Sequence, residues 1–317
     1  MNVLLLSHQL DYSGAPLALF RLAQTLMDQG HSVSLGTQQD GPLGKEFVNI
    51  GVQQFNPSMA KAYDLYIANT FLTVPLALHL APSADKIVAW IHESRSFFTL
   101  YGKDETQYGL SHLRRAVFPS KFQINEYRDL MPDCELHQLR NVVSMTGIER
   151  SNTYSDHFSV SGTWEVRKNQ VGLLKLIGDT DLNIKLNFVG ASKPDDLDST
   201  KHNYFGQVPL AEAKSIIASS CGLISAALNE TQNLAAIEAI LVANPVLLSN
   251  IPAHQELKEL IPDITLFDTA DAASFADGFD RAMRQKQNLK SLEEGRKSAE
   301  IYFGNSAFSE AVRSLTT

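Results

Sequence analysis

The sequence predicts an α/β protein of two Rossmann-like domains, each with a parallel sheet covered by helices. The chain has 317 residues, which is long for one hydrophobic core and suits two domains of roughly 150 residues each. Short apolar runs alternate with amphipathic helical patterns in both halves, as in successive βαβ units. A polar stretch at residues 144–156, which contains Gly147, separates the two halves and is the expected linker.

The first half opens with an apolar run at residues 3–6, which predicts a buried strand. A loop at residues 11–15 is followed by apolar residues at helical spacing through Met27, and Gly30 marks the end of that helix. Residues 31–35 alternate as a second strand. Further strands are predicted at residues 65–68, 86–92 and 116–118, and a further helix at residues 121–131. This alternation predicts a doubly wound domain.

The second half repeats the alternation. Its strands are predicted at residues 157–161, 184–189, 222–226 and 245–248, and its helices at residues 168–177, 209–219 and 234–242. The segment 284–316 is helical in pattern, with an expected interruption at residues 301–303 and an N-cap at Ser306. We therefore expect domains at residues 1–150 and 151–298, followed by a C-terminal helix within residues 299–317.

Composition and charge disfavour several classes of protein. The formal net charge of -8 argues against a non-specific nucleic-acid binder, which needs many cations to neutralise phosphates. Cys134 and Cys221 lie far apart without C-x-x-C spacing, which predicts neither a zinc site nor a disulfide and fits a cytoplasmic protein. Since no apolar stretch approaches ~18 residues, the sequence predicts no membrane span.

The loop Ser13-Gly14-Ala15 is the first candidate for phosphate chemistry. Glycine lets the backbone approach a phosphate closely, and the helix that follows would offer free N–H groups at its N-terminus. The full G-x-G-x-x-G fingerprint is absent, so a glycine that serves only a turn is the alternative.

Two glutamates eight positions apart, Glu230 and Glu238, form the second candidate. Glu238 lies between apolar residues of a predicted helix, where an unpaired carboxylate is costly, and it could accept hydrogen bonds from ribose hydroxyls. The helix opening at Gln232, Asn233 and Leu234 would present N–H groups to a diphosphate. Two solvated glutamates are the alternative.

Three basic or imidazole side chains complete the candidates. Arg167 and Lys168 are predicted at a helix N-terminus, where two cations oppose the helix dipole and an anionic ligand would relieve the conflict. His92 ends a predicted strand, where it could hold a sugar hydroxyl or stabilise developing charge. A surface pair and a structural histidine are the alternatives.

Two further patterns receive weaker interpretations. Asp196-Leu197-Asp198 matches D-x-D, but such pairs are frequent in acidic loops, and we predict no metal there. The basic residues Arg114, Arg115, Lys121 and Arg128 would form either a patch for an anionic acceptor or membrane surface, or a solvated face.

Taken in order, short segments of the chain resemble the family-4 retaining glycosyltransferases of GT-B fold. Each segment is short, and their shared order and spacing carry the resemblance from near residue 1 to about residue 258. The segments are Ser13-Gly14-Ala15, Gly30-His31-Ser32-Val33, Arg140-Asn141-Val142-Val143, residues 162–170, residues 204–208, the E-x7-E spacing from Glu230 to Glu238, Ala243-Asn244-Pro245-Val246 and residues 251–256.

The resemblance implies a donor site mainly in the C-terminal domain. There Glu238 would bind the ribose, Glu230 would orient the donor sugar, and Lys168 would neutralise the diphosphate together with N–H groups of residues 232–234.

The resemblance also assigns the N-terminal domain to the acceptor side of a cleft. Gly14, beside Ala15, would approach the diphosphate or the sugar, and His92 would touch the donor sugar. The C-terminal helix would pack back on this domain.

Two departures from the family pattern bear on the chemistry. Thr163 stands where the family has an arginine, and Arg167 is the candidate to replace that charge. Gln232-Asn233 replaces an aromatic–glycine pair, which leaves the nucleotide open.

The activity that the resemblance implies is retaining transfer of a sugar from a UDP- or GDP-sugar to a glycan, a lipid-linked or another acceptor, without cofactor or metal. Bacterial surface polysaccharide or glycan assembly is the expected setting. A cytoplasmic protein, peripheral to the inner face of the membrane, without stable nucleic-acid binding, is expected. A nucleotide-sugar epimerase or hydrolase on the same scaffold stays open, as does a catalytically weak sugar-nucleotide-binding scaffold subunit, which Thr163 favours slightly.

Overall fold

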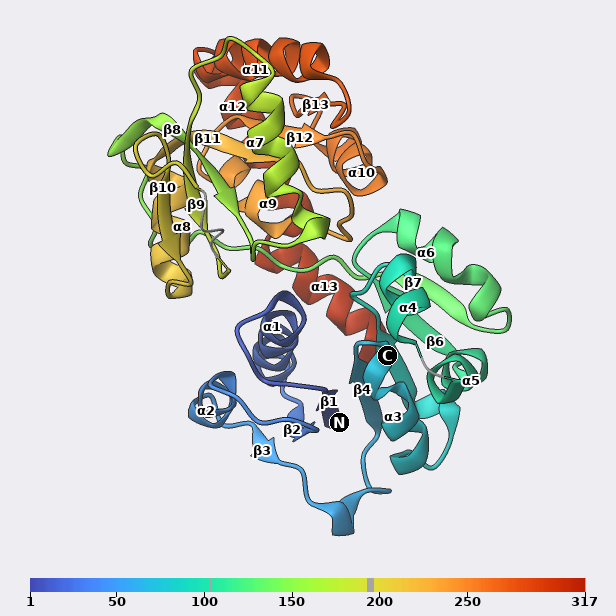
Figure 1. The fold of residues 1–317 in the computed structure, drawn as a ribbon. Coiled ribbons are helices and arrows are strands. Elements are labelled where there is room, and N and C mark those ends of the chain that lie inside the picture. The colour runs from blue at the N-terminus through green and yellow to red at the C-terminus, as the bar shows by residue number, and fades with distance from the viewer. Residues whose placement is uncertain (103, 193–196, 317) are drawn as a thin grey trace. The chain divides into compact units, whose positions relative to one another are not determined.

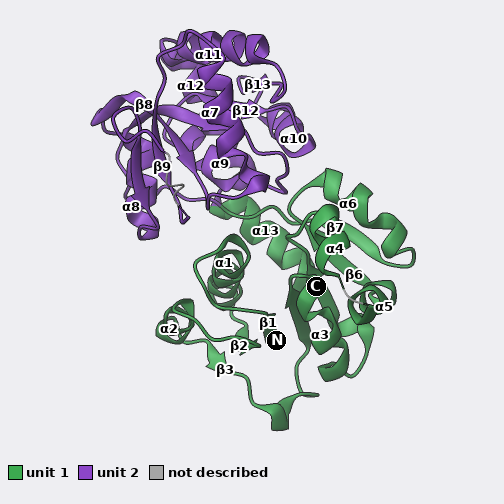
Figure 2. Ribbon diagram, viewed as in Figure 1, with its two compact units in different colours: residues 1–142, 305–317 green, residues 143–304 purple. Residues whose placement is uncertain are grey.

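The computed structural model describes residues 1–102, 104–192 and 197–316 (Figure 1). The chain forms two compact units, shown in Figure 2: unit 1 comprises residues 1–142 and 305–317, and unit 2 comprises residues 143–304. Within the described residues, unit 1 contains a seven-stranded sheet and unit 2 a six-stranded sheet, and the paired strands are parallel. The predicted fold class is therefore confirmed.

The sheet of unit 1 has the strand order β3-β2-β1-β4-β5-β6-β7. Its strands are β1 (Asn2–Ser7), β2 (Ser32–Thr37), β3 (Gln53–Gln54), β4 (Leu65–Asn69), β5 (Ile87–Trp90), β6 (Arg115–Phe118) and β7 (Glu135–Gln138). Its helices are α1 (Gly14–Asp28), α2 (Leu43–Asn49), α3 (Val74–Leu80), α4 (Arg95–Tyr101), α5 (Asp104–His112), α6 (Lys121–Tyr127) and α13 (Asn305–Thr316). The order runs outward in both directions from β1, so the boundary of β1 and β4 is the topological switch point, where such sheets bind ligands.

The core of unit 1 lies on both faces of this sheet. Along β1, Val3 and Leu5 belong to one buried cluster, whereas Leu4 and Leu6 belong to the other. Successive side chains of a strand point to opposite faces, so a strand covered on both sides reads as a continuous apolar run. Phe308 of α13 packs into the same cluster as Val3, which makes the end of the chain part of the unit 1 core.

The sheet of unit 2 has the order β10-β9-β8-β11-β12-β13, with its switch point between β8 and β11. Its strands are β8 (Tyr154–Ser161), β9 (Lys185–Val189), β10 (Asn203–Gly206), β11 (Ser220–Ser225), β12 (Val246–Ser249) and β13 (Thr265–Phe267). Its helices are α7 (Gln170–Gly178), α8 (Leu210–Ser219), α9 (Leu234–Leu241), α10 (Pro252–Leu260), α11 (Ala272–Lys286) and α12 (Leu289–Phe303).

The first helix of unit 2 begins later than the sequence predicted. Residues Val166–Lys168 form a 3-10 turn, and α7 starts only at Gln170. Between them Asn169 has a left-handed backbone with φ of 55°. Asparagine tolerates this conformation better than most residues, and its side chain donates to the Ala226 carbonyl at 3.1 Å. Arg167 and Lys168 therefore lie in a turn before the helix, not in its first turn.

The expected interruption at residues 301–303 is wrong. Helix α12 continues through Phe303, which is buried in the core of unit 2, and the break comes at Gly304. Helix α13 then begins at Asn305, one residue before the expected cap at Ser306. Of the three apolar residues only Phe303 faces the core, whereas Ile301 and Tyr302 are exposed on the helix, so the apolar run gave a false stop signal.

The units divide after Val142 and after Gly304, whereas the sequence placed the divisions after residues 150 and 298. Val143 packs into the core of unit 2, and its amide donates to the Phe303 carbonyl at 2.9 Å. The two places where the chain passes from one unit to the other, at Val143 and at Gly304, are therefore close together. Among the described helices, none combines the length and apolar character that a membrane crossing requires.

Candidate functional site

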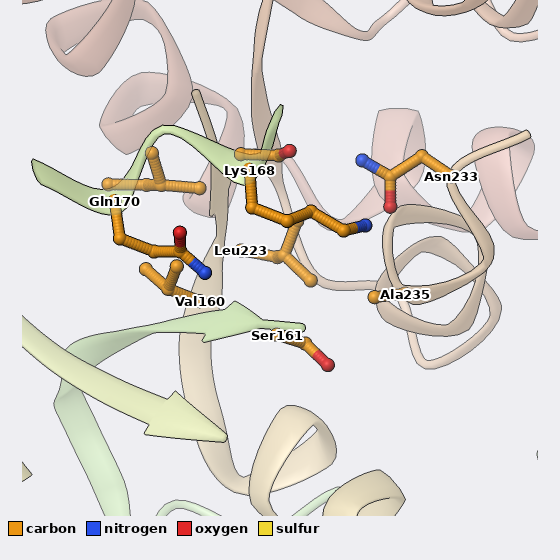
Figure 3. A pocket seen from close by; sticks show the side chains of 9 residues that line it. Val160, Ser161, Lys168, Gln170, Leu223, Asn233 and Ala235 are labelled. Atoms are coloured by element: carbon orange, nitrogen blue, oxygen red, sulfur yellow. The ribbon is translucent and has the colours of Figure 1, made fainter. Parts of the chain in front are cut away.

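A small pocket lies at the carboxyl ends of the two central strands of unit 2 (Figure 3). Its walls come from β8, β11, the turn before α7 and the start of α9. The lining residues are Val160, Ser161, Lys168, Gln170, Leu223, Ile224, Ser225, Asn233 and Ala235. Because the strand order reverses between β8 and β11, the pocket occupies the position where α/β sheets of this kind bind ligands.

Close backbone contact holds the turn that carries the basic residues. Gly162 and Gly190 both have left-handed backbones, with φ of 135° and 146°. A Cβ on Gly190 would lie 2.1 Å from the carbonyl oxygen of Gly162, so only glycine permits this approach. The Gln170 side chain donates from Nε2 to the Thr163 carbonyl at 3.0 Å and ties α7 to the same loop. The Lys168 side chain is therefore presented from a fixed turn.

Three of the predicted site residues meet in one ionic cluster. The Glu230 side chain is only 6% exposed, and its two oxygens accept from the Lys168 ammonium and from Arg167 Nη1, the latter at 3.2 Å. Arg167 also pairs with Glu165 at 2.6 Å. A buried carboxylate is tolerated when it is paired and hydrogen-bonded, which explains how Glu230 remains at this depth.

The start of α9 forms the opposite wall of the pocket, and Figure 3 shows the Lys168 side chain extending towards Asn233. Asn233 caps the helix, since its Oδ1 accepts from the Ala236 amide at 3.2 Å. Within the described part of the chain, the amides of Leu234 and Ala235 meet no hydrogen-bond acceptor. Free amides at a helix N-terminus attract anions. Gln232, directly before the cap, is partly buried.

Glu238 lies within α9 and does not join the cluster of Glu230. Its side chain is 11% exposed, and its Oε1 lies 3.9 Å from Nζ of Lys214 on α8. Lys214 in turn donates to the Ser144 carbonyl at 2.6 Å. Sequence reasoning missed Lys214, because one lysine on a predicted helix has no pattern that separates it from a solvated surface residue.

The remaining predicted residues, Gly14, Ala15 and His92, lie in unit 1 near its own switch point. The Ala15 carbonyl accepts from Asn69 Nδ2 at 3.0 Å, and Asn69 Oδ1 lies 2.9 Å from His92 Nε2. Asn69 thus links the start of α1 to His92, which follows the end of β5. Gly14 has open space where a Cβ would stand. Sequence reasoning missed Asn69; its signal was a polar residue that ends a buried strand.

The hydrogen bond with Asn69 places the proton of His92 on Nε2, because the Asn69 oxygen can only accept. Burial, together with the nearby His8, lowers the pKa of His92 to about 3, so its imidazole is neutral at physiological pH. Burial raises the pKa of the adjacent Glu93 to about 7. Thr70, the residue after Asn69, has φ of 92°, which is a strained backbone conformation for a β-branched residue.

No group of three or more His, Cys, Asp or Glu side chains in the described ranges is arranged to hold a metal ion. Of the acidic pair noted in the sequence, Asp196 lies outside the described residues. Asp198 accepts from the Thr200 amide at 3.0 Å and from the Thr200 hydroxyl at 2.6 Å.

Comparison with known proteins gives one family match and several similar structures. Residues 1–150 match the model of glycosyl-transferase family 4. HepE from Anabaena, solved with UDP and glucose, is 14% identical over 100% of this chain and 99% of that chain, with a TM-score of 0.82. Sucrose-phosphate synthase from Thermosynechococcus elongatus is 16% identical over 99% of this chain and 98% of that chain, with a TM-score of 0.78.

WaaG, a glycosyltransferase involved in lipopolysaccharide biosynthesis, is 12% identical over 99% of both chains, with a TM-score of 0.68. A search of curated proteins found no match. At such identities the structural likeness establishes the fold, and the roles of the site residues stay predictions. Residues 1–150 match glycosyl-transferase family 4, and the whole chain has the GT-B fold of these transferases, as the sequence predicted.

Proposed function

We propose that the chain is a retaining glycosyltransferase that moves a sugar from a nucleoside diphosphate sugar to an acceptor hydroxyl. One observation carries the proposal: the pocket of unit 2 is lined both by the Lys168 side chain and by the start of α9, where the amides of Leu234 and Ala235 are free. An ammonium and a helix N-terminus that line one pocket suit a diphosphate.

The same groups supply the chemistry that transfer requires. As the bond between the anomeric carbon and the diphosphate breaks, negative charge gathers on the leaving phosphate. Lys168, Arg167 and the α9 amides would stabilise that charge from fixed positions, so the proposal includes neither a bound metal nor a cofactor. The retaining outcome rests on the resemblance of the Glu230 to Glu238 spacing to the family element.

Glu230 would exchange partners when the donor binds. In this structure its carboxylate forms ion pairs with both Lys168 and Arg167. An incoming diphosphate competes for the same two cations and would leave the Glu230 oxygens to accept from sugar hydroxyls. Binding and orientation of the donor would thus be parts of one exchange of ion pairs.

Glu238 would accept hydrogen bonds from the ribose hydroxyls, and Lys214 would remain the cation paired with its carboxylate. HepE has been solved with UDP and with UDP-glucose, which makes a UDP-sugar the first donor to test and a GDP-sugar the second. The proposed acceptor is a glycan or lipid-linked molecule of surface polysaccharide assembly, reached by a cytoplasmic protein with peripheral membrane contact.

A thermal-shift panel tests the donor site. UDP, GDP, ADP and TDP, each with its common sugar conjugates, are added in EDTA and again with magnesium. A ligand at 100 times its dissociation constant adds about 2.7 kcal/mol of stability, which is readily seen. We expect one nucleotide to stabilise the protein equally in both buffers.

Stabilisation that requires magnesium would overturn the metal-free site, and no shift with any nucleotide would favour a scaffold protein. The stereochemistry is read separately, by NMR of the anomeric proton of a product made with the stabilising donor. Inversion of that centre would contradict the retaining reaction.

A further inference from the structure

A fully buried histidine lies behind the start of α9 and has no role in the chemistry proposed above. His254 of α10 is 0% exposed. Its Nδ1 lies 2.8 Å from the Ser249 carbonyl oxygen at the end of β12, and its Nε2 lies 3.0 Å from Nδ2 of Asn233, the cap of α9. The imidazole therefore bridges the end of a central strand and the cap of the helix that lines the pocket.

The hydrogen bonds around His254 admit one assignment of protons. The Ser249 carbonyl can only accept, so Nδ1 carries the proton and donates. Asn233 uses its Oδ1 to accept from the Ala236 amide, which directs its Nδ2 at the imidazole. Nε2 of His254 must then be unprotonated and accept from Asn233. The orientation of the Asn233 amide thus depends on the tautomer of His254.

We propose that His254 is a positioning residue of the donor site, which holds the Asn233 amide so that its oxygen caps α9 and the amides of Leu234 and Ala235 remain for phosphate. The inference rests on the proposed function, because the phosphate is that of the donor. Without the imidazole, the Nδ2 group of Asn233 would lose its buried acceptor, and only the bond from the Ala236 amide would fix the orientation of the side chain. A rotated amide would present its NH2 group to the Ala236 N–H.

The charge state of His254 supports this role. Burial holds the pKa of His254 below the usual range. The hydrogen bond to the Ser249 carbonyl and the charge of Glu230 oppose that shift, and Lys168 adds to it. The imidazole is therefore neutral at physiological pH. A proton on Nε2 would set two donors, the imidazolium and the Asn233 amide, against each other in a buried site, which is costly.

Nitrogen-15 NMR of the histidine side chains in the wild-type protein tests the arrangement without any ligand. We expect His254 to show an unprotonated Nε2 and a protonated Nδ1 at pH 7, and to keep that state below its ordinary pKa of 6.5. A proton on Nε2 at pH 7, or titration at the ordinary pKa, would overturn the proposal. The resonance is assigned by its loss in His254→Gln.

Calorimetric binding of UDP and of inorganic pyrophosphate to variants tests the consequence. His254→Leu should weaken both by about tenfold, the size of one buried hydrogen bond. His254→Gln, whose side-chain oxygen can accept from Asn233, should stay within about threefold of wild type, and hydrogen exchange of the Ala236 amide should be faster only in the leucine variant. His202→Leu, a matched loss of a buried histidine elsewhere in unit 2, should leave binding unchanged.

The outcomes separate this inference from the proposed function. Equal losses in the leucine and glutamine variants, or no loss in either, would overturn the positioning role. A wild type that binds neither UDP nor pyrophosphate would contradict the donor site itself, while the tautomer and the Ala236 exchange would still decide whether His254 orients Asn233.

Discussion

Lys168 is the residue on which the proposed donor site depends most. Its ammonium lines the pocket, and its side chain is only 19% exposed, so a diphosphate would meet it in a partly dehydrated setting. Lys168→Ala should weaken UDP binding at least about tenfold, because a charge-assisted hydrogen bond of about 1.5–3 kcal/mol is lost. Isothermal calorimetry measures the change.

Lys175→Ala is the matched control. Lys175 lies on α7, its side chain is 78% exposed, and its ion pair with Asp179 lies on the surface. The substitution removes the same charge from the same unit, so it should change UDP affinity by less than about twofold, as expected for an exposed charge screened by solvent. Equal losses in both variants would show a general effect of charge and would remove the case for Lys168.

Glu93 and His92 make opposite contributions to stability as the pH changes. The Glu93 pKa rises from 4.5 to about 7 on folding, so the folded protein keeps a proton that the unfolded chain loses, and stability falls as the pH rises through that window. The His92 pKa falls from 6.5 to about 3, so the unfolded chain gains a proton that the folded protein refuses, and stability falls as the pH drops through that window. Between pH 4.5 and 6.5 the two slopes cancel.

Glu93→Gln should therefore remove one slope and reveal the other. Relative to wild type, the variant should gain stability on going from pH 4.5 to pH 8 by about 3 kcal/mol. Urea unfolding at several pH values measures this, with the exposed Glu126→Gln on α6 as the control for a lost carboxylate. A wild-type-like pH dependence in Glu93→Gln would contradict the raised pKa.

At the scale of elements, the contact of Gly190 with Gly162 positions the whole basic turn. Gly190→Ala would place a Cβ 2.1 Å from a backbone oxygen and would also force alanine into a left-handed backbone. We expect a loss of more than about 2 kcal/mol in unfolding free energy and weaker UDP binding, because the loop that carries Lys168 must move.

Gly178→Ala is the control for that substitution. Gly178 ends α7, and a Cβ there meets nothing within 4 Å. Alanine should be neutral, or stabilising by up to about 1 kcal/mol, with unchanged UDP binding. If Gly190→Ala behaved like Gly178→Ala in denaturation and calorimetry, the close backbone contact would not be a constraint.

Sequence periodicity predicted the central elements because their physics is local. The apolar run of β1 and the helical spacing of α1 depend on burial alone, and both were found with shifts of a few residues at their ends. The start of α7 was not predicted, because the left-handed Asn169 is held by the carbonyl of Ala226, which directly follows β11 and lies far away in the sequence. Short segments such as β3 and β13 carry too few residues to show a period.

The candidate site was predictable where its residues lie close together in the sequence. Glu230, Asn233 and Glu238 are neighbours along one loop and helix, so their spacing had a meaning before the fold was known. Asn69 and His254 become relevant only through partners more than 20 positions away, with separations of 23 residues for Asn69–His92 and 21 for Asn233–His254. Asn69 offered only a weak local signal, a polar residue at the end of a buried strand, and the partners of both residues became visible only in the fold.

At the scale of the whole molecule, two phenylalanines five positions apart serve different units. Phe303, at the end of α12, is buried in the core of unit 2, and Phe308, in α13, is buried in the core of unit 1. Replacing a buried phenylalanine with alanine costs about 3–5 kcal/mol. Phe308→Ala should therefore destabilise unit 1, and Phe303→Ala should destabilise unit 2, although both residues lie within four positions of Gly304 in the sequence.

The two tryptophans of the chain allow each unit to be followed separately. Trp90 is in unit 1, with its ring centroid 6.0 Å from that of Phe308, and Trp164 is in unit 2, 4.9 Å from Phe188. In a Trp164→Phe background the fluorescence of Trp90 reports unit 1, and in a Trp90→Phe background that of Trp164 reports unit 2. Phe308→Ala should lower the unit 1 melting temperature by on the order of 10 °C and leave the unit 2 signal within a few degrees.

Phe303→Ala should give the reverse pattern, which makes each variant the control for the other. If each substitution lowered both fluorescence transitions equally, the chain would unfold as one cooperative body, and the assignment of α13 to the stability of unit 1 alone would fail. If the pattern holds, the last 13 residues belong energetically to a core that the first 142 residues build. Removing residues 305–317 should then expose the apolar cluster around Val3 and Leu5 and unfold unit 1 before unit 2.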